Sequence, residues 1–254
     1  MTALSTGEQR RVCVLTGAGG KLGNAFCQKY AADYEIVAVC RRRPPDVPSQ
    51  LERYVDPLAP SDESVNAASV YVIYADLARP GEVERVVDLV MARYGRVDLL
   101  VNNAAETAFH PTGLADGEQA LADFDRFYTT NVGAPLRLAV RFAQRFWHAD
   151  AADNRAHNRN VVNISSLSGH QVYSGGQGIY ASTKAALNHL TRHLALEYQS
   201  FGVRVNGLSP TSFPALIPSE EVADAVVRLD RETVTGKILR VDVEDVASGA
   251  EQAG

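Results

Sequence analysis

The sequence lacks the features that mark several specialised classes of protein. No apolar run approaches the length of a membrane span, and the first residues, MTALSTGEQRR, contain no apolar segment of a secretory signal. Basic residues are not in excess, since 25 Lys and Arg stand against 30 Asp and Glu for a net charge of −5. We therefore expect no membrane or nucleic-acid partner, and a cytoplasmic location.

Cysteine is scarce, and its positions predict no disulfide framework. The three cysteines, Cys13, Cys27 and Cys40, are odd in number, and their spacing fits no zinc pattern. His189 and His193 have the i, i+4 spacing of metal ligands, but no third ligand accompanies them. We expect no metal site, and a reducing compartment suits the free thiols.

Short apolar runs rich in Val and Ile alternate with amphipathic stretches along all 254 residues. Consecutive apolar residues are typical of strands buried on both faces of a parallel sheet. The alternation predicts one α/β domain, residues 1–254, with a doubly wound parallel sheet of seven strands. The predicted strands are RVCVLTG (11–17), EIVAVCR (35–41), SVYVIYAD (69–76), VDLLVNNA (97–104), NVVNISS (160–166), VRVNGLSP (203–210) and GKILRVD (236–242).

Two stretches interrupt this alternation. Residues 43–68 begin RPPDVPSQ and favour a loop, because repeated proline disrupts helices. Residues 148–160, HADAADNRAHNRN, are polar and predict a surface loop. The single tryptophan, Trp147, ends a long apolar helical pattern, and we expect it in the core.

A glycine-rich turn, TGAGGKLG (16–23), follows the first predicted strand. Glycines there let the backbone approach a pyrophosphate, and the next helix supplies N–H donors and the positive end of its dipole. A bare tight turn is the alternative. The strand before it and the helix after it favour nucleotide binding.

The second strand ends in Arg41, Arg42 and Arg43, and no acidic residue follows before Asp46. An acid at this place binds the ribose 2′-hydroxyl of NAD, whereas arginine matches the 2′-phosphate of NADP. The sequence therefore favours NADP(H). The alternative is a solvated basic strand end.

Tyr180 and Lys184, in the stretch YASTK, lie one helical turn apart on one face. They follow NISS, which contains Ser165 and Ser166. Tyr–Lys pairs of this spacing are common on helix surfaces, and the two serines could cap a helix. Their order after a nucleotide turn favours proton transfer at a carbonyl oxygen.

Together these motifs resemble the short-chain dehydrogenase/reductase family over nearly the whole chain. TGAGGKLG resembles its T-G-x-x-x-G-x-G turn, and Asp76-Leu77 resembles its adenine-contacting pair. VNNAA (101–105) resembles its N-N-A-G strand end, and TTNVGAPL (129–136) carries its mid-helix Asn. NISS, YASTK, VRVNGLSP and TGKILRVD follow in the family's order. The resemblance implies a Rossmann-type fold.

The resemblance also implies roles for four catalytic residues. Tyr180 would protonate the carbonyl oxygen during reduction, or accept the proton in the reverse direction. The Lys184 ammonium would lower the pKa of Tyr180, ordinarily about 10, and hold the nicotinamide ribose. Ser166 would hydrogen-bond the substrate oxygen, and Asn131 would hold a water linking Lys184 to solvent.

The implied cofactor is NADP(H), and the implied assembly is a homodimer or homotetramer through the helices around 120–147 and 177–201. The residues implied to contact the cofactor are Gly17, Gly20, Lys21, Leu22, Gly23, Arg41, Arg42, Asp76, Leu77, Asn103, Ala104, Tyr180, Lys184, Pro210 and Thr211.

The chain departs from the family pattern in its turn and its substrate loop. Lys21 replaces the second glycine of the turn, which puts the geometry of the turn in question. The loop near 211–221 is much shorter than in the family. The short loop suits a bulky or carrier-tethered substrate, a site completed by a partner subunit, or an impaired enzyme. Simple trimming, with the 106–120 segment covering the site, is the remaining alternative.

We therefore expect an NADPH-dependent oxidoreductase that reduces a ketone or aldehyde. One alternative is an alcohol dehydrogenase working in the oxidative direction. The other is a catalytically impaired nucleotide-binding scaffold that pairs with an active homologue.

Overall fold

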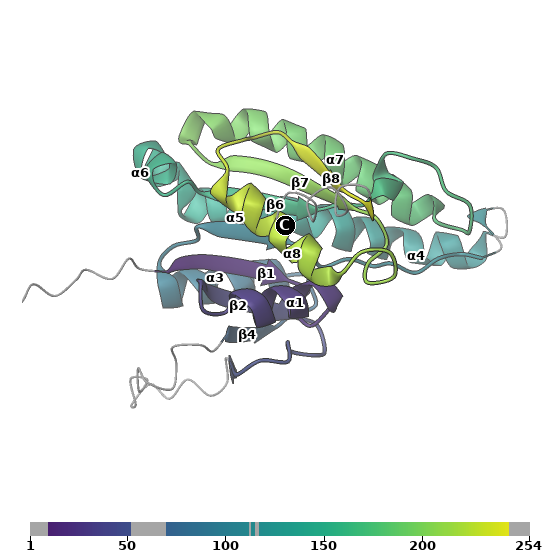
Figure 1. Ribbon diagram of the computed structural model, residues 1–254, viewed down its shortest axis with the longest axis horizontal. Helices are drawn as coiled ribbons and strands as arrows, with labels where there is room; N and C mark the ends of the chain where they lie inside the picture. The colour runs from purple at the N-terminus through teal and green to yellow at the C-terminus, as the bar shows by residue number, and fades with distance from the viewer. Residues whose placement is uncertain (1–9, 52–69, 112, 115–116, 244–254) are drawn as a thin grey trace, which may run out of the picture.

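A single parallel sheet forms the centre of the molecule (Figure 1). The structure, a computed structural model, describes residues 10–51, 70–111, 113–114 and 117–243. The strand order is β3-β4-β2-β1-β5-β6-β7-β8, and every neighbouring pair is parallel. The strands are β1 (Arg11–Thr16), β2 (Tyr34–Cys40), β3 (Ser49–Leu51), β4 (Val70–Tyr74), β5 (Leu99–Asn102), β6 (Asn160–Ile164), β7 (Arg204–Pro210) and β8 (Ile238–Val241).

The predicted doubly wound parallel sheet is confirmed, with eight strands rather than seven. The additional strand, β3, lies in the 43–68 segment that was predicted to be a loop. It pairs with β4 along the outer edge of the sheet, and the Val70 N–H donates to Pro48 O at 3.0 Å. A three-residue edge strand forms through its neighbour's unpaired backbone groups, which local composition does not reveal. Residues 52–69 of that segment lie outside the described residues.

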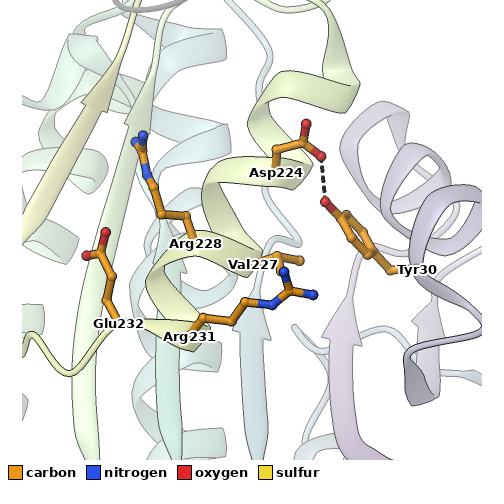
Figure 2. Close-up of a pocket in the computed structure, with 6 residues that line it drawn as sticks. All are labelled: Tyr30, Asp224, Val227, Arg228, Arg231 and Glu232. Atoms are coloured by element: carbon orange, nitrogen blue, oxygen red, sulfur yellow. Dashed lines mark hydrogen bonds between the residues drawn. The ribbon is translucent and has the colours of Figure 1, made fainter. Parts of the chain in front are cut away.

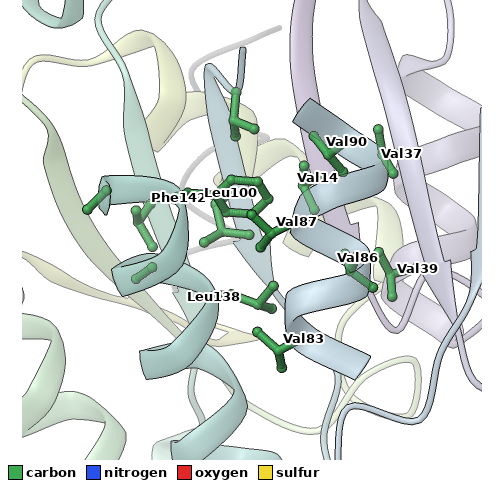
Figure 3. Packing of buried hydrophobic residues seen from close by; sticks show 14 of the residues in the cluster. Val14, Val37, Val39, Val83, Val86, Val87, Val90, Leu100, Leu138 and Phe142 are labelled. Atoms are coloured by element: carbon green, nitrogen blue, oxygen red, sulfur yellow. The ribbon is translucent and has the colours of Figure 1, made fainter. Parts of the chain in front are cut away.

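Helices cover both faces of the sheet and bury two separate cores. Alternate residues of β1 point to opposite faces, with Val12 and Val14 in one core and Cys13 and Leu15 in the other. Helices α3 (Glu82–Tyr94) and α5 (Ala134–Arg145) cover the first face, where valines of α3 pack against β1, β2 and α5 (Figure 3). Helices α1 (Lys21–Tyr30) and α8 (Ser219–Arg231) cover the second, with α8 in front of the sheet in Figure 1.

The polar stretch 148–160 is largely helical, which corrects the predicted surface loop. It contains the 3₁₀ turn η4 (Trp147–Ala149) and the short helix α6 (Ala151–Ala156). Asp150 caps α6 by accepting from the backbone N–H groups of Ala152 and Asp153, both at 2.9 Å. Asn154 is buried and donates to Trp147 O and Phe201 O. Trp147 itself is fully buried, as expected.

The topology places a switch point at the carboxyl edge of the sheet, and we call this place the crevice. The chain runs from β1 outward to β2 on one side, and β5 then pairs with β1 on the other. Ligands of doubly wound folds bind outside the carboxyl ends of the strands at such a switch point. Two further helices lie beyond β5, α4 (Glu118–Tyr128) and α7 (Gly178–Tyr198), and α7 carries the Tyr–Lys pair.

Candidate active site

The glycine turn is tight although Lys21 stands where the family has a glycine. Gly17 has a φ of +66°, and a Cβ there would lie 2.9 Å from Ala104 Cα, so a larger residue would strain the turn. The Gly20 N–H donates to Gly17 O at 2.9 Å, and Gly20 caps α1. Lys21 is the first residue of α1 and is exposed, so its side chain leaves the backbone of the turn unobstructed.

The start of α1 fits a bound phosphate. The first N–H groups of a helix have no intrahelical acceptor, and the helix dipole adds positive potential there. The first turn of α1 contains no acidic residue that would repel an anion. Gly23 lies so close to Ala18 that a Cβ would approach its Cα to 2.5 Å, which draws the helix against the turn. Leu22 is buried beneath it.

The end of β5 is tied directly to this turn. The Thr16 hydroxyl accepts from the backbone N–H groups of Asn103 and Ala104, both at 3.0 Å. The Asn103 side chain donates to Thr16 O at 3.0 Å and Gly17 O at 3.1 Å. The structure thus brings Gly17, Asn103 and Ala104 together, and these bonds fix the floor of the crevice.

An ionic network occupies the end of the crevice where arginine was predicted to bind a 2′-phosphate. Arg41 and Arg42 are both exposed at the end of β2, and Arg41 pairs with Glu106, just beyond β5. Arg126 of α4 donates to the same Glu106 carboxylate at 2.8 Å, and lies 3.7 Å from Asp76. Glu106 and Arg126 were missed from the sequence, because no local motif connects them with Arg41. Leu77, beside Asp76, is buried.

The predicted catalytic serine, tyrosine and lysine lie together between β6 and α7. Ser166 follows β6 and lies close enough to the Tyr180 hydroxyl to oppose the rise in its pKa. The Lys184 Nζ lies 5.6 Å from the centre of the Tyr180 ring and donates to Ile164 O at 2.8 Å. Ser165 instead donates to Lys184 O at 3.2 Å, so Ser165 supports the helix while Ser166 faces the tyrosine. Of the two serines Ser166 is therefore the one beside the tyrosine, and its catalytic role stays a prediction.

Burial controls the proton affinities of this pair. Burial raises the pKa of Tyr180 above its ordinary value, and the Ser166 hydrogen bond offsets only part of that rise. Burial also lowers the pKa of Lys184 to about 8. The pKa of Tyr180 therefore moves opposite to the lowering expected from Lys184, because loss of hydration disfavours the phenolate.

Asn131 lies in a π-helical turn, η3 (Thr129–Gly133), between α4 and α5. Its Oδ1 accepts from the Glu106 N–H at 2.8 Å, and its Nδ2 donates to Glu106 O and to the Thr183 hydroxyl, both at 3.0 Å. Asn131 thus connects the segment after β5 with α7. Both amide hydrogens are engaged, and the predicted role of Asn131 in holding a relay water stays a prediction.

The end of β7 lies on the other side of β6. Pro210 is buried, and the Thr211 N–H donates to Val241 O of β8 at 2.9 Å. These two residues are therefore anchored to the sheet beside the catalytic group but apart from the arginine end. Residues 211–218 alone join β7 to α8, and Ile217 within them is fully buried in the core.

Two loops border Tyr180 and present apolar side chains. The His110 N–H donates to Gly176 O at 3.0 Å, which joins the segment after β5 to the segment before α7. Phe109 contacts the Tyr180 ring edge-on, with ring centres 6.2 Å apart. Phe109 is half exposed, and Val172 in the second loop is completely exposed. Phe109 thus places part of the 106–120 segment against Tyr180, while cover of the whole site by that segment stays a prediction.

A cavity of about 430 Å³ lies elsewhere, between α1 and α8 (Figure 2). Its lining residues are Tyr30, Asp224, Val227, Arg228, Arg231 and Glu232. Tyr30 and Arg231 end their helices at the amino edge of the sheet, away from the glycine turn and Tyr180. The Tyr30 hydroxyl donates to Asp224 at 2.6 Å, so these two polar groups satisfy each other. We therefore assign the candidate site to the carboxyl-edge crevice.

Other binding classes find little support in the described ranges. No group of three or more His, Cys, Asp or Glu side chains there is arranged to hold a metal ion. His189 and His193 lie on the exposed face of α7, with their Nε2 atoms 3.1 Å apart. Within the same ranges, no helix combines the length and apolarity needed to cross a bilayer.

A dinucleotide cradle beside a partly buried tyrosine that can exchange a proton is typical of a nicotinamide-dependent oxidoreductase. The short chain dehydrogenase family model matches residues 11–224. Secoisolariciresinol dehydrogenase of Forsythia intermedia is 27% identical over 257 residues, covering 98% of this chain and 84% of that protein. Glucose and ribitol dehydrogenase of Daucus carota is 30% identical over 217 residues, covering 83% of this chain and 68% of that protein.

Solved structures agree in fold. A short-chain dehydrogenase/reductase from Serratia marcescens superposes with a TM-score of 0.69 and 23% identity, covering 92% of this chain and 97% of that one. The chain belongs to the short-chain dehydrogenase/reductase family. Members of this family are oxidoreductases that use NAD(P)(H) to interconvert alcohols and carbonyl compounds.

Proposed function

We propose that the protein is an NADPH-dependent reductase of a ketone or aldehyde, with Tyr180 as the general acid. The observation that carries this proposal is the juxtaposition of Tyr180, Ser166 and Lys184 between β6 and α7, where partial burial raises the pKa of Tyr180. A protonated phenol can give its proton to a carbonyl oxygen during reduction.

In the proposed mechanism the residues of the chain bind, orient and supply a proton. The bound cofactor supplies a hydride to the carbonyl carbon. Ser166 and Tyr180 hold the carbonyl oxygen, and Tyr180 Oη donates its proton as negative charge develops there. Lys184, charged below about pH 8, stabilises the transient phenolate from the same helix face. Asn131 fixes α7 relative to the segment after β5.

The preference for NADP(H) rests on Arg41 and Arg42 at the end of β2. Both are exposed at the carboxyl edge, where the adenosine ribose lies in this class of fold. Arginine matches phosphate oxygens through a planar set of donors, whereas the NAD ribose offers only a hydroxyl. Lys21 at the start of α1 adds a third cation near the turn. A location in a reducing cytoplasm is consistent with the three free, buried cysteines.

The substrate is proposed to carry an apolar group and to reach Tyr180 through an open entrance. Phe109 and Val172 offer exposed apolar surface in the loops that border Tyr180. The connection between β7 and α8, residues 211–218, is short, and this leaves space at the entrance for a large or carrier-tethered substituent. Because water has access to such an entrance, we expect affinity to rise with the apolar area that the substrate buries.

Replacement of Tyr180 by Phe tests the assignment, since it removes only the phenolic oxygen. We expect kcat for carbonyl reduction to fall by about 10²- to 10⁴-fold, the usual contribution of a general acid, while the Kd for NADPH changes little. Steady-state kinetics across a panel of ketones and aldehydes, together with fluorescence titration of NADPH and NADH, measure both quantities.

Tyr173→Phe is the matched control, because Tyr173 is exposed and hydrogen-bonds Gln171 rather than the catalytic group. Unchanged turnover in Tyr180→Phe would refute the general-acid role. A wild-type protein that binds NADPH but turns over no carbonyl or alcohol would favour the scaffold alternative.

A further inference from the structure

The Arg41–Glu106 ion pair lies across the cofactor crevice. Arg41 follows β2 and Glu106 follows β5, and β1 with its glycine turn lies between those two strands. A bond between the two outer strand ends therefore passes over the carboxyl end of β1. That position is the switch point where a dinucleotide enters this class of fold.

Glu106 is the fixed member of the pair. Its backbone N–H donates to Asn131 Oδ1, and its carbonyl accepts from Asn131 Nδ2, so both sides of the residue are held. Its carboxylate also accepts from Arg126 Nε at 2.8 Å. The side chain of Glu106 is 17% exposed, against 42% for Arg41. Arg41 is thus the member that can move away, and among the described residues it gives up its ion pair with Glu106 when it does so.

The same geometry creates a competition for Arg41. The guanidinium uses its NH1 group on Glu106, and a 2′-phosphate at the end of β2 would draw the same cation. The Glu106 carboxylate would also repel that phosphate, because like charges at short range raise the free energy of the complex. Arg126 remains beside Glu106 after Arg41 leaves, so the carboxylate keeps a partner.

We propose that Glu106 tunes cofactor affinity by holding Arg41 across the crevice, so that a ligand must break this ion pair before Arg41 can bind its 2′-phosphate. This inference rests on the proposed NADP(H)-binding site. A 2′-phosphate gives Arg41 a new anionic partner in place of the Glu106 carboxylate, whereas a free 2′-hydroxyl does not. Glu106 therefore lowers affinity for every adenosine ligand, and the 2′-phosphate alone restores part of it.

The test is Glu106→Gln, which removes the charge and keeps the shape. Calorimetry would measure the Kd of NADPH, NADH and adenosine 2′,5′-bisphosphate, the last of which isolates the adenosine end from the chemistry. Removing one exposed ion pair and one like-charge contact should change the affinity for a phosphate-bearing ligand by about three- to tenfold. We expect the bisphosphate and NADPH to bind that much tighter, and NADH to gain less.

Two further variants make the result specific. Glu197→Gln removes the same charge from the exposed end of α7 and should leave all three Kd values unchanged. In an Arg41→Met background the gain from Glu106→Gln should shrink, because Arg41 is no longer there to be released.

Weaker binding in Glu106→Gln would overturn the proposal by showing that Glu106 orients Arg41 for the phosphate. Equal gains in both backgrounds, or no gain, would also overturn it. If neither the wild type nor the variant bound any of the three ligands, the proposed cofactor site itself would be wrong. Binding by the wild type with no effect of Glu106→Gln would remove only this inference.

Discussion

At the scale of single residues, the buried ammonium of Lys184 links the site to pH. Lys184 is 3% exposed and sits in the interior beside Tyr180, where its charge has lost hydration. Burial lowers its pKa from an ordinary value of 10.5 to about 8 in the folded protein. The unfolded chain therefore binds more protons than the folded one between about pH 8 and 10.5.

This difference fixes the sign of a stability change. Below pH 8 both states carry the charge, and the folded state bears the full desolvation cost. As the pH rises from about 8 to 10.5 that cost disappears, so the free energy of unfolding of the wild type should rise relative to that of Lys184→Met. The expected relative gain is roughly 3 kcal/mol. Urea unfolding of both proteins from pH 7 to 11 measures it, and parallel curves would contradict burial as the cause.

At the scale of secondary-structure elements, Asn131 connects η3, the segment after β5 and the catalytic helix α7. Asn131→Ala would leave the Glu106 N–H and C=O and the Thr183 hydroxyl without the amide. Each buried polar group left without a partner costs about 1–3 kcal/mol, and water can satisfy some of them. We expect a loss of about 2–4 kcal/mol in the free energy of unfolding. We also expect kcat to fall, because α7 is no longer held in position against the segment after β5.

Thr183→Val is the comparison for that variant, because it keeps the two bonds between Asn131 and Glu106 and removes the one to α7, together with the bond from the Thr183 hydroxyl to Tyr180 O. Denaturant unfolding and kcat together distinguish the two variants. The Asn131→Ala loss should exceed that of Thr183→Val. Equal losses would show that the contact with Glu106 contributes nothing, and that the segment after β5 is held by other bonds.

The seven predicted strands were readable from sequence because their residues are apolar on both faces. Two elements were not. The strand β3 depends on an edge that β4 offers, and α6 depends on the Asp150 cap and on buried Asn154, both of which look polar in isolation. Helix formation there comes from specific hydrogen bonds rather than from an apolar stripe.

The residues of the candidate site were likewise predictable only in part. Gly17, Tyr180 and Lys184 were predictable because their motifs are local and recur at a fixed place in a strand–helix unit. Glu106 was not, since its partners come from β2 and α4 and meet only through the strand order. The raised pKa of Tyr180 was also missed, because spacing reveals the neighbouring lysine but not the extent of burial.

At the scale of the whole molecule, α4 and α7 present a solvent-exposed surface. The two helices are in contact, and the Tyr128 hydroxyl of α4 donates to Ser182 of α7 at 3.1 Å. Leu121 on α4 is 72% exposed, and Leu196 on α7 is 71% exposed. Along α7 the exposed positions Ser182, Ala185, His189, His193 and Leu196 recur every three or four residues, which makes one continuous helical face. Exposed large apolar side chains on such a face favour a protein–protein contact.

We propose that a second copy of the chain covers this face, giving a homodimer or homotetramer. A two-fold contact would bring the small residues of one α7 close to those of the other, and stable interfaces bury about 1,200–2,000 Å² in total. Leu196→Glu should weaken association by at least tenfold, because it buries an unpaired carboxylate at the contact. Sedimentation velocity would record the shift toward monomer.

Val172→Glu is the matched control, since Val172 is equally apolar and fully exposed but lies in the loop before α7 rather than on this face. It should leave the sedimenting mass unchanged. A wild-type protein that sediments as a monomer at micromolar concentration would refute the proposed assembly. A dimer that survives Leu196→Glu would place the contact elsewhere on the molecule. If the dimer does form here, Tyr180 and Lys184 sit on the interface helix, so dissociation should lower kcat as well as mass.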